Sequence, residues 1–426
     1  MSENMKASGI AWIGDIPESW SIKRVKYLAT LKGRIGWQGL TSDEYTDEGP
    51  YLITGIDFEN GKVNWDNCVH ISRERWEEAT EIQIQNGDLL ITKDGTVGKV
   101  AIVSELNDLA SLNSGVLVIR TNSGFDRRFL FWVLQSEEFW VWFRLKNAGN
   151  STIIHLYQND FAEFCYTYPK TIEQTLIADF LDEQCEKIDS ISTNLEKQIE
   201  ILRKYKKSLI TETVTKGLDK SVPMKDSGIE WIGDIPEHYS LVPLKNLFWM
   251  YAGGDVDEYD FSDERTDKYK YAIYSNSLEN NGLFGYMSKY RFKGDTITVT
   301  GRGDVGKALP RYDAYYPIVR LLVCVPQKKL SVSFFSYCIN CADILGDQTA
   351  MAQLTTQKLG VVKVPVPTYE EQTHIAKYLD KQCAKVDSII ESKKEQLIKI
   401  TQHKKSLIYE YVTGKKRVKG ENNNGN

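Results

Sequence analysis

Two internal repeats constrain this chain more than any other feature of its sequence. Residues 5–21 recur at 224–240 with 13 of 17 positions identical, at an offset of 219. Residues 169–191 return at 367–389, at an offset of 198. Each half is therefore predicted to contain a short opening motif, a globular segment and a closing helical segment.

The closing segments predict long helices. A 4–3 spacing of apolar side chains, typical of a coiled-coil seam, starts at Ile177 and again at Ile375 and runs for nearly five heptads. At 1.5 Å per residue, about 40 residues give a helix of roughly 60 Å. An antiparallel pair would bury both stripes; alternatively, each helix folds onto its own domain. The predicted seam consists of Ile177, Leu181, Ile188, Ile191, Leu195, Leu202, Leu209, Ile375, Leu379, Val386, Ile389, Ile400 and Leu407.

The globular segments mix strands and helices. Residues 87–103 and 294–310 are predicted as a strand, a Gly-rich turn and a strand, each followed by an aromatic-rich helix. The predicted fold class is α+β: two mixed α/β domains separated by two long antiparallel coiled-coil helices, with a pseudo-twofold internal duplication. The predicted boundaries are 1–170 and 227–369 for the domains, 171–215 and 370–414 for the helices, 216–226 for a linker and 415–426 for a disordered tail.

Charge and composition exclude little. The chain has 426 residues and 53 basic against 58 acidic groups, a net charge of −5, so its charge alone does not predict nucleic-acid binding. Only residues 371–426 are basic, with 12 cationic and 7 anionic groups. The seven cysteines follow no disulfide framework, and no apolar run has the length of a membrane span. We expect a cytoplasmic protein with reduced thiols.

Possible catalytic motifs are better explained as structural features. Residues 301–308 satisfy G-x(4)-G-K, but Ala308 stands where a nucleotide-binding loop needs Ser or Thr, and the first-half counterpart has Lys93 in place of the first glycine. A turn between strands is therefore predicted. Cys338 and Cys341 form a CxxC without a second pair, which favours buried small residues over a zinc site. We predict no catalytic residues, bound metal or cofactor.

Loop residues supply candidate DNA contacts. Cations, amides, hydroxyls and aromatic rings are the groups that reach phosphates and base edges, although each residue also fits an ordinary solvated loop. The candidates are Lys32, Arg34, Trp37, Gln38, Lys93, Thr96, Lys99, Ser275, Asn276, Arg302, Lys307 and Arg311.

Two motifs, each present twice, carry a family resemblance. W-I-G-D-I-P-E begins at Trp12 and Trp231, and E-Q-x-x-I-A-x-x-L-D begins at Glu173 and Glu371. Together they resemble the specificity subunit of type I restriction–modification enzymes, over nearly the whole chain. The resemblance implies two target recognition domains that each read one half of a split, asymmetric site in double-stranded DNA.

The same resemblance implies partners. The helices would dock two modification subunits that methylate adenine with S-adenosylmethionine, and two restriction subunits that use ATP and Mg²⁺ would join them. Those cofactors would belong to the partners. Two alternatives remain: a scaffold that joins proteins without touching DNA, and a self-contained enzyme with an unrecognised active site.

Overall fold

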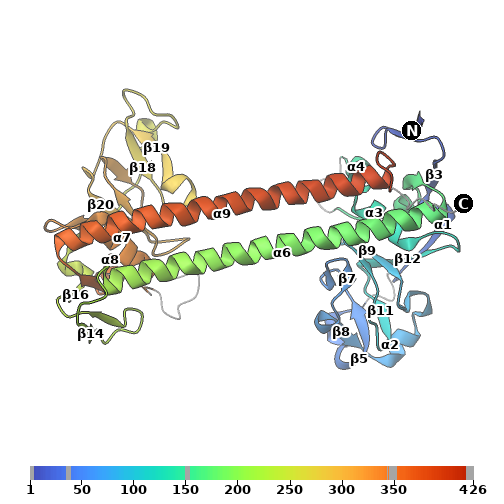
Figure 1. Ribbon diagram of the computed structural model, residues 1–426, viewed down its shortest axis with the longest axis horizontal. Helices are drawn as coiled ribbons and strands as arrows, with labels where there is room; N and C mark the ends of the chain where they lie inside the picture. Colours follow the sequence, from blue (N-terminus) through green and yellow to red (C-terminus); the bar gives the residue numbers. More distant parts are fainter. Residues whose placement is uncertain (1–3, 35–39, 149–153, 343, 345–352, 419–426) are drawn as a thin grey trace, which may run out of the picture. The chain divides into compact units, whose positions relative to one another are not determined.

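The structure is a computed structural model that describes residues 4–34, 40–148, 154–342, 344 and 353–418. It consists of two compact units (Figure 1). Unit 1 comprises Met1–Asn194 and Gln396–Asn426, and unit 2 comprises Leu195–Glu395. Each unit therefore combines one globular segment with parts of both closing helices.

Unit 1 is built on a four-stranded antiparallel sheet of order β10-β9-β12-β4 and a three-stranded sheet of order β11-β5-β8. In the smaller sheet, β11 pairs with β5 in parallel. Short antiparallel pairs join β1 to β2, β3 to β13 and β6 to β7. The strands are β1 Met5–Ala7, β2 Asp15–Pro17, β3 Ser21–Arg24, β4 Ala29–Gly33, β5 Tyr45–Ile53, β6 Phe58–Glu59, β7 Lys62–Val63, β8 Val69–Ile71, β9 Leu89–Thr92, β10 Val100–Ile102, β11 Ala110–Leu112, β12 Val116–Thr121 and β13 Cys165–Tyr168.

Unit 2 repeats this topology. Its sheets have the orders β21-β20-β23-β17 and β22-β18-β19, and β22 again pairs with β18 in parallel. Two short antiparallel pairs, β14–β15 and β16–β24, match those of the opening and closing segments in unit 1. The strands are β14 Met224–Asp226, β15 Asp234–Pro236, β16 Ser240–Pro243, β17 Phe248–Ala252, β18 Tyr271–Tyr274, β19 Leu283–Met287, β20 Thr296–Thr300, β21 Ala308–Arg311, β22 Tyr315–Pro317, β23 Leu321–Pro326 and β24 Lys363–Val366.

The helices differ more between the units than the sheets do. The aromatic-rich helix expected at 127–143 is two helices that meet at Ser136, whereas its counterpart in unit 2 is a single helix, α7. The helices are α1 Val25–Leu28, α2 Arg73–Glu77, α3 Arg127–Gln135, α4 Glu137–Lys146, α5 Gln158–Ala162, α6 Thr171–Lys216, α7 Val332–Cys341, α8 Thr356–Gly360 and α9 Tyr369–Val412.

A cluster of aromatic side chains lies in the core of unit 1. The Phe139 ring lies 5.5 Å from the Phe164 ring and 6.1 Å from the Phe161 ring, both in edge-to-face arrangements. Aliphatic residues of α6 and α9, including Leu181 and Leu407, belong to the same buried cluster. The helices are therefore part of the domain core, which fixes the sheet relative to them.

The two long helices pack antiparallel in each unit. In unit 1, the ring of Phe180 of α6 lies tilted against that of Tyr411 of α9 with centroids 4.4 Å apart, and further along α6 Asp189 pairs with Lys404 at 2.6 Å. In unit 2 a separate apolar cluster joins Ile199 of α6 to two residues of α9, Val386 and Ile390. The sequence numbers rise on one helix as they fall on the other, so the antiparallel pairing is confirmed.

The fold class is thus α+β, with two mixed domains of the same topology and two long antiparallel helices (Figure 1). Each helix begins close to a proline, Pro169 or Pro367, as the sequence predicts. At 46 residues, α6 has a length of about 70 Å.

The predicted seam is wrong at two equivalent positions. The side chains of Ile191 and Ile389 are 49% and 47% exposed. On α6, Cys185 and Ile199 are buried and Ser192 between them is half-buried, so alternate layers lie one residue later than predicted. The spacing of 4 and 3 is retained. A pattern that counts only large apolar residues selects Ile191 over its small neighbour Ser192, although Ser192 is the less exposed of the two.

The prediction of a disordered tail is wrong for residues 415–418. Lys415 Nζ donates to the backbone oxygens of Ile13 and Asp15 at 2.8 and 2.7 Å, and Arg417 pairs with Glu173. These contacts hold Lys415 and Arg417 against the opening motif and the start of α6 in unit 1. A polar segment can be ordered when the groups that it meets are fixed backbone carbonyls and a carboxylate, which composition does not reveal.

Candidate nucleic-acid interface

Two equivalent hairpin turns contain most of the exposed candidate residues. One turn, Thr92–Lys99, joins β9 to β10, and the other, Thr300–Lys307, joins β20 to β21. The Gly98 and Gly306 N–H groups donate to the carbonyls of Thr92 and Thr300 at 2.9 and 2.8 Å. Both turns thus have the same backbone frame.

Buried threonine hydroxyls complete that frame. Thr92 Oγ1 accepts from the Lys99 N–H at 2.9 Å, and Thr300 Oγ1 accepts from the Lys307 N–H at the same distance. Each hydroxyl also donates to a carbonyl inside its own turn. Residues 301–307 form a hairpin turn, as predicted, because the antiparallel strand β21 follows them directly from Ala308. A nucleotide-binding loop would instead lead into a helix.

The turns present cations to solvent. Lys99, Arg302 and Lys307 are exposed, and Lys93 is half-buried. Thr96 is exposed at the tip of the first turn, and its hydroxyl donates to the Gly55 carbonyl at 3.4 Å. Exposed cations on a rigid turn are suited to phosphate oxygens, since the backbone need not be ordered on binding.

The second turn has a polar loop beside it. Asn276 Oδ1 accepts from the Gly301 N–H at 2.9 Å, and its Nδ2 donates to the Val319 carbonyl. Ser275 hydrogen-bonds to Gly282 through both its backbone N–H and its hydroxyl. The structure therefore brings four of the predicted residues together in unit 2: Ser275, Asn276, Arg302 and Lys307.

Two predicted arginines point into the protein. Arg34 is buried and donates from Nε to the Leu112 carbonyl at 2.8 Å and from Nη2 to Ser111 at 3.0 Å. Arg311 is buried over the Tyr274 ring, 3.5 Å from its centroid, and donates to Thr298. Burial lowers the pKa of both guanidinium groups. In this conformation both arginines brace strands and loops and offer no guanidinium to a DNA surface.

Lys32 of β4 is at the surface and pairs with Glu81 at 2.6 Å. The candidates Trp37 and Gln38 lie outside the described residues.

The sequence analysis did not predict one exposed aromatic surface of unit 2. Trp249 and Tyr251 of β17 are exposed, and Tyr251 lies 5.7 Å from the Phe292 ring, which Arg291 also approaches. Aromatic rings next to a cation suit base and phosphate contacts. The sequence offers no signal for this surface, because β17 reads FWMYA and no polar–apolar alternation marks Trp249 and Tyr251 as exposed.

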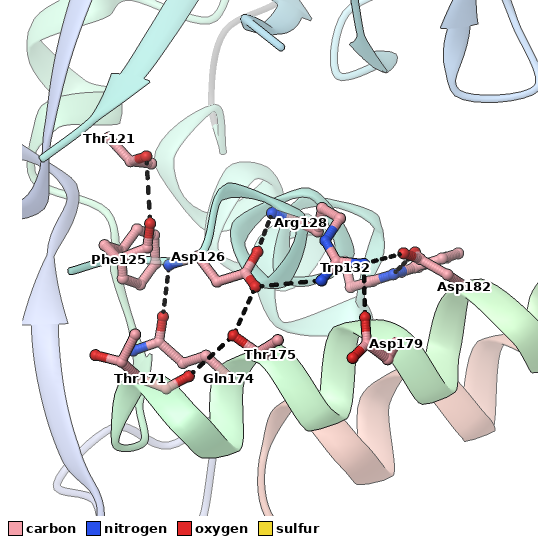
Figure 2. Close-up of polar contacts among 10 residues, drawn as sticks. All are labelled: Thr121, Phe125, Asp126, Arg128, Trp132, Thr171, Gln174, Thr175, Asp179 and Asp182. Carbon is pink, nitrogen blue, oxygen red and sulfur yellow. Dashed lines mark hydrogen bonds and ion pairs between the residues drawn. The ribbon is translucent and has the colours of Figure 1, made fainter. Parts of the chain in front are cut away.

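The E-Q-x-x-I-A-x-x-L-D motif fastens each domain to its long helix. In Figure 2, Gln174 lies under the start of α3, and its Oε1 accepts from the Asp126 N–H at 3.1 Å. Its Nε2 donates to the Pro169 carbonyl at 2.8 Å. In unit 2, Gln372 makes the same two bonds, with the Ser331 N–H and the Pro367 carbonyl.

The aspartate of the motif makes a second attachment. Asp182 Oδ1 accepts from Trp132 Nε1 at 2.7 Å, and Asp380 Oδ1 accepts from the Tyr337 hydroxyl at 2.8 Å. In unit 1, Arg128 adds ion pairs to Asp182 and two other aspartates (Figure 2). The glutamate of the motif binds the opening motif, since Glu173 accepts from Trp20 Nε1 at 2.9 Å. The motif therefore fastens the long helix to the globular segment through equivalent bonds in both units.

Within the residues that the structure describes, no group of three or more metal-ligating side chains is present. Cys338 is buried, and burial raises the pKa of its thiol well above the ordinary value, which agrees with a small apolar role. No helix of the described part is long and apolar enough to cross a membrane.

Comparisons with known proteins agree with this architecture. The chain is 25% identical to the type I restriction enzyme MjaVIII specificity subunit of Methanocaldococcus jannaschii over 96% of this chain and 95% of that one. It is 23% identical to the EcoBI specificity subunit of Escherichia coli over 77% and 73%. A solved structure concerning assembly and conformational transition of the type I R-M system superposes with a TM-score of 0.71 at 14% identity, over 93% of this chain and 98% of that chain, and therefore supports the fold.

The family comparison covers both halves. Residues 17–201 and 236–402 each match the type I restriction modification DNA specificity domain. Each matched segment contains one hairpin turn and one motif that fastens the domain to its helix. This chain therefore belongs to the family of type I restriction–modification DNA specificity subunits.

Proposed function

We propose that the chain recognises a bipartite, asymmetric DNA target, with one half-site read by each globular domain. The observation that carries the proposal is that the two hairpin turns share the same backbone hydrogen bonds but expose different side chains. The hydroxyl and glycine bonds of the turns are the same in both units, and each turn ends in an exposed lysine, Lys99 or Lys307. The positions of Asp94 and Thr96 in the first turn are occupied by Arg302 and Asp304 in the second. Equal frames that differ at these positions suit two different half-sites.

We also propose that catalysis resides in partners. Two modification subunits would methylate adenine with S-adenosylmethionine, and two restriction subunits would use ATP and Mg²⁺, in the cytoplasm. The exposed Ile191 and Ile389 support a twofold docking arrangement, because they are equivalent positions of the repeat and offer the same side chain on α6 and α9. Equivalent surfaces suit two copies of one partner.

The test is a reconstitution. The chain is assembled with its modification subunit, and DNA binding and adenine methylation are measured for the assembly and for each component alone. We expect sequence-specific binding and methylation from the assembly and no methylation from the purified chain. Assembly without any DNA sequence preference would favour a protein scaffold, and methyl transfer by the isolated chain would show a self-contained enzyme.

A further inference from the structure

Each unit presents an exposed aliphatic side chain on a loop beside its cationic turn. Ile56 follows β5 by three residues and is 77% exposed. Leu278 follows β18 by four residues and is 40% exposed. Single exposed apolar residues are common on protein surfaces, so exposure alone does not mark a site. The structure of the loops is what distinguishes these two.

The loop that carries Ile56 is held rigidly. Asp57 is buried, and its Oδ2 accepts from the Thr54 N–H at 2.6 Å and from the Thr54 hydroxyl at 2.9 Å. The Asp57 N–H donates a hydrogen bond to the Thr54 carbonyl at 3.3 Å. Ile56 therefore stands on a closed turn and loses little freedom when it meets a ligand.

This loop rests directly on the cationic turn. Thr96 donates to the Gly55 carbonyl, and a Cβ atom at Gly55 would come within 3.1 Å of Thr92 Cγ2 and 3.3 Å of Thr96 Oγ1. A side chain at Gly55 would require these threonine side chains to shift by a few tenths of an ångström. The aliphatic tip and the turn that ends at Lys99 thus form one continuous surface.

The loop that carries Leu278 is fastened by other residues. Asn276 joins it to Gly301 of the turn, and Arg311 Nη2 donates to the Asn281 carbonyl at 2.8 Å. Asn280 and Asn281 both have positive φ, a conformation that costs energy in residues other than glycine and that the surrounding bonds maintain. Different bonds in the two units give the same result, a loop with an exposed aliphatic side chain that is fastened to the cationic turn.

A DNA groove offers a specific partner for such a side chain. The C5-methyl group of thymine is the apolar feature of the major-groove edges, and aliphatic contact with it distinguishes thymine from cytosine. We propose that Ile56 and Leu278 each contact a thymine methyl group, one in each half-site, while the adjacent cations bind phosphates. This inference rests on the proposed function and names the base feature that each domain reads.

The test removes either the thymine methyl group from the DNA or the aliphatic side chain from the protein. The assembly with the modification subunit is titrated with duplexes in which single thymines of the target are replaced by deoxyuridine, which lacks only that methyl. We expect one position in the half-site of unit 1 at which the replacement weakens binding about fourfold, the effect of burying one methyl-sized group. The Ile56→Ala variant should bind the parent duplex more weakly by at least this factor and be insensitive to deoxyuridine at that position.

Controls separate the possible failures. Leu145→Ala removes an exposed aliphatic side chain from α4 of the same unit and should retain the full deoxyuridine effect, and Leu278→Ala should change only the other half-site. If binding is sequence-specific but no thymine responds, or if Ile56→Ala responds to deoxyuridine as the parent does, the inference is wrong and the proposed function stands. If the assembly shows no sequence preference, the proposed function itself fails.

Discussion

Lys404 Nζ lies 2.6 Å from Asp189 Oδ1 and joins α9 to α6 within unit 1. The positions 198 residues away from Asp189 and Lys206 are Asp387 and Lys404, and Lys206 pairs with Asp387 at 2.6 Å in unit 2. Exchanging the two repeats therefore exchanges the two ion pairs. The duplication seen in the sequence is present in the contacts of the helices as well.

This ion pair should contribute modestly to stability. A double-mutant cycle with Asp189→Asn and Lys404→Met should give a coupling of about 0.5–1 kcal/mol, because the lysine is mostly covered while the aspartate is half exposed. Urea unfolding of the four proteins measures it. The same cycle on Glu183 and Lys187, an exposed pair within α6, is the control and should give about 0.3–0.5 kcal/mol. A coupling at Asp189 no larger than the control would contradict a role in joining the helices.

The glutamine of the motif should matter more. Gln174→Ala leaves the Asp126 N–H and the Pro169 carbonyl without their buried partner, and should cost about 1–3 kcal/mol of unfolding free energy. Gln372→Ala should have a similar cost, since it breaks the equivalent bonds. Chemical denaturation with Gln396→Ala, an exposed position on α9, provides the comparison. Unchanged stability in both motif variants would show that the attachment is not made by these amides.

Stability should fall as the pH rises towards 8. Glu138 is fully buried, neither carboxylate oxygen has a hydrogen-bond partner in the described structure, and burial raises its pKa from 4.5 to about 8. The folded chain keeps this proton up to about pH 8, whereas the unfolded chain releases it near pH 4.5. Between these values the folded state binds more protons, so its stability declines with rising pH.

The Glu138→Gln variant removes the titrating group and keeps the shape. Its unfolding free energy, measured by urea denaturation from pH 5 to 8.5, should depend less on pH than that of the parent. Glu137→Gln, at the exposed neighbouring position, should retain the parent's dependence. Parallel pH profiles for the parent and the Glu138→Gln variant would show that Glu138 is ionised in the folded chain.

Much of this architecture is readable from the repeats, for a physical reason. The helices start near Pro169 and Pro367, and the turns before Lys99 and Lys307 depend on short local bonds of threonine and glycine. Local rules suffice where the hydrogen bonds are local.

Side-chain direction is harder to predict, because it depends on distant segments. Arg34 looks like a DNA contact in a Gly-rich loop, yet the carbonyl and hydroxyl that hold it belong to Leu112 and Ser111, nearly eighty residues later. Ile191 looks like a seam residue, yet its side chain is exposed and the neighbouring Ser192 is half-buried. The roles of Gln174 and Asp182 were likewise hidden, although their motif was recognised, since their partners lie in α3 and its cap.

The exposed cations should set the salt dependence of DNA binding. Replacing both Arg302 and Lys307 by alanine should lower the slope of log affinity against log salt by about 2, if each neutralises one phosphate. Binding of the assembly is measured between 50 and 200 mM salt, and Lys363→Ala, at an exposed position of β24, is the control. A slope equal to that of the parent would exclude these two residues as phosphate contacts.

The most direct test of the two-reader account is the methylated motif of assemblies altered in one turn only. One variant carries Thr96→Ala and Lys99→Ala, and the other carries Arg302→Ala and Lys307→Ala. Each is combined with the modification subunit, and the methylated adenines are mapped by sequencing. The account predicts that each variant relaxes the base preference of one half-site, a different half for each, and leaves the other half as in the parent. Relaxation of both halves by either variant, or of the same half by both, would contradict it.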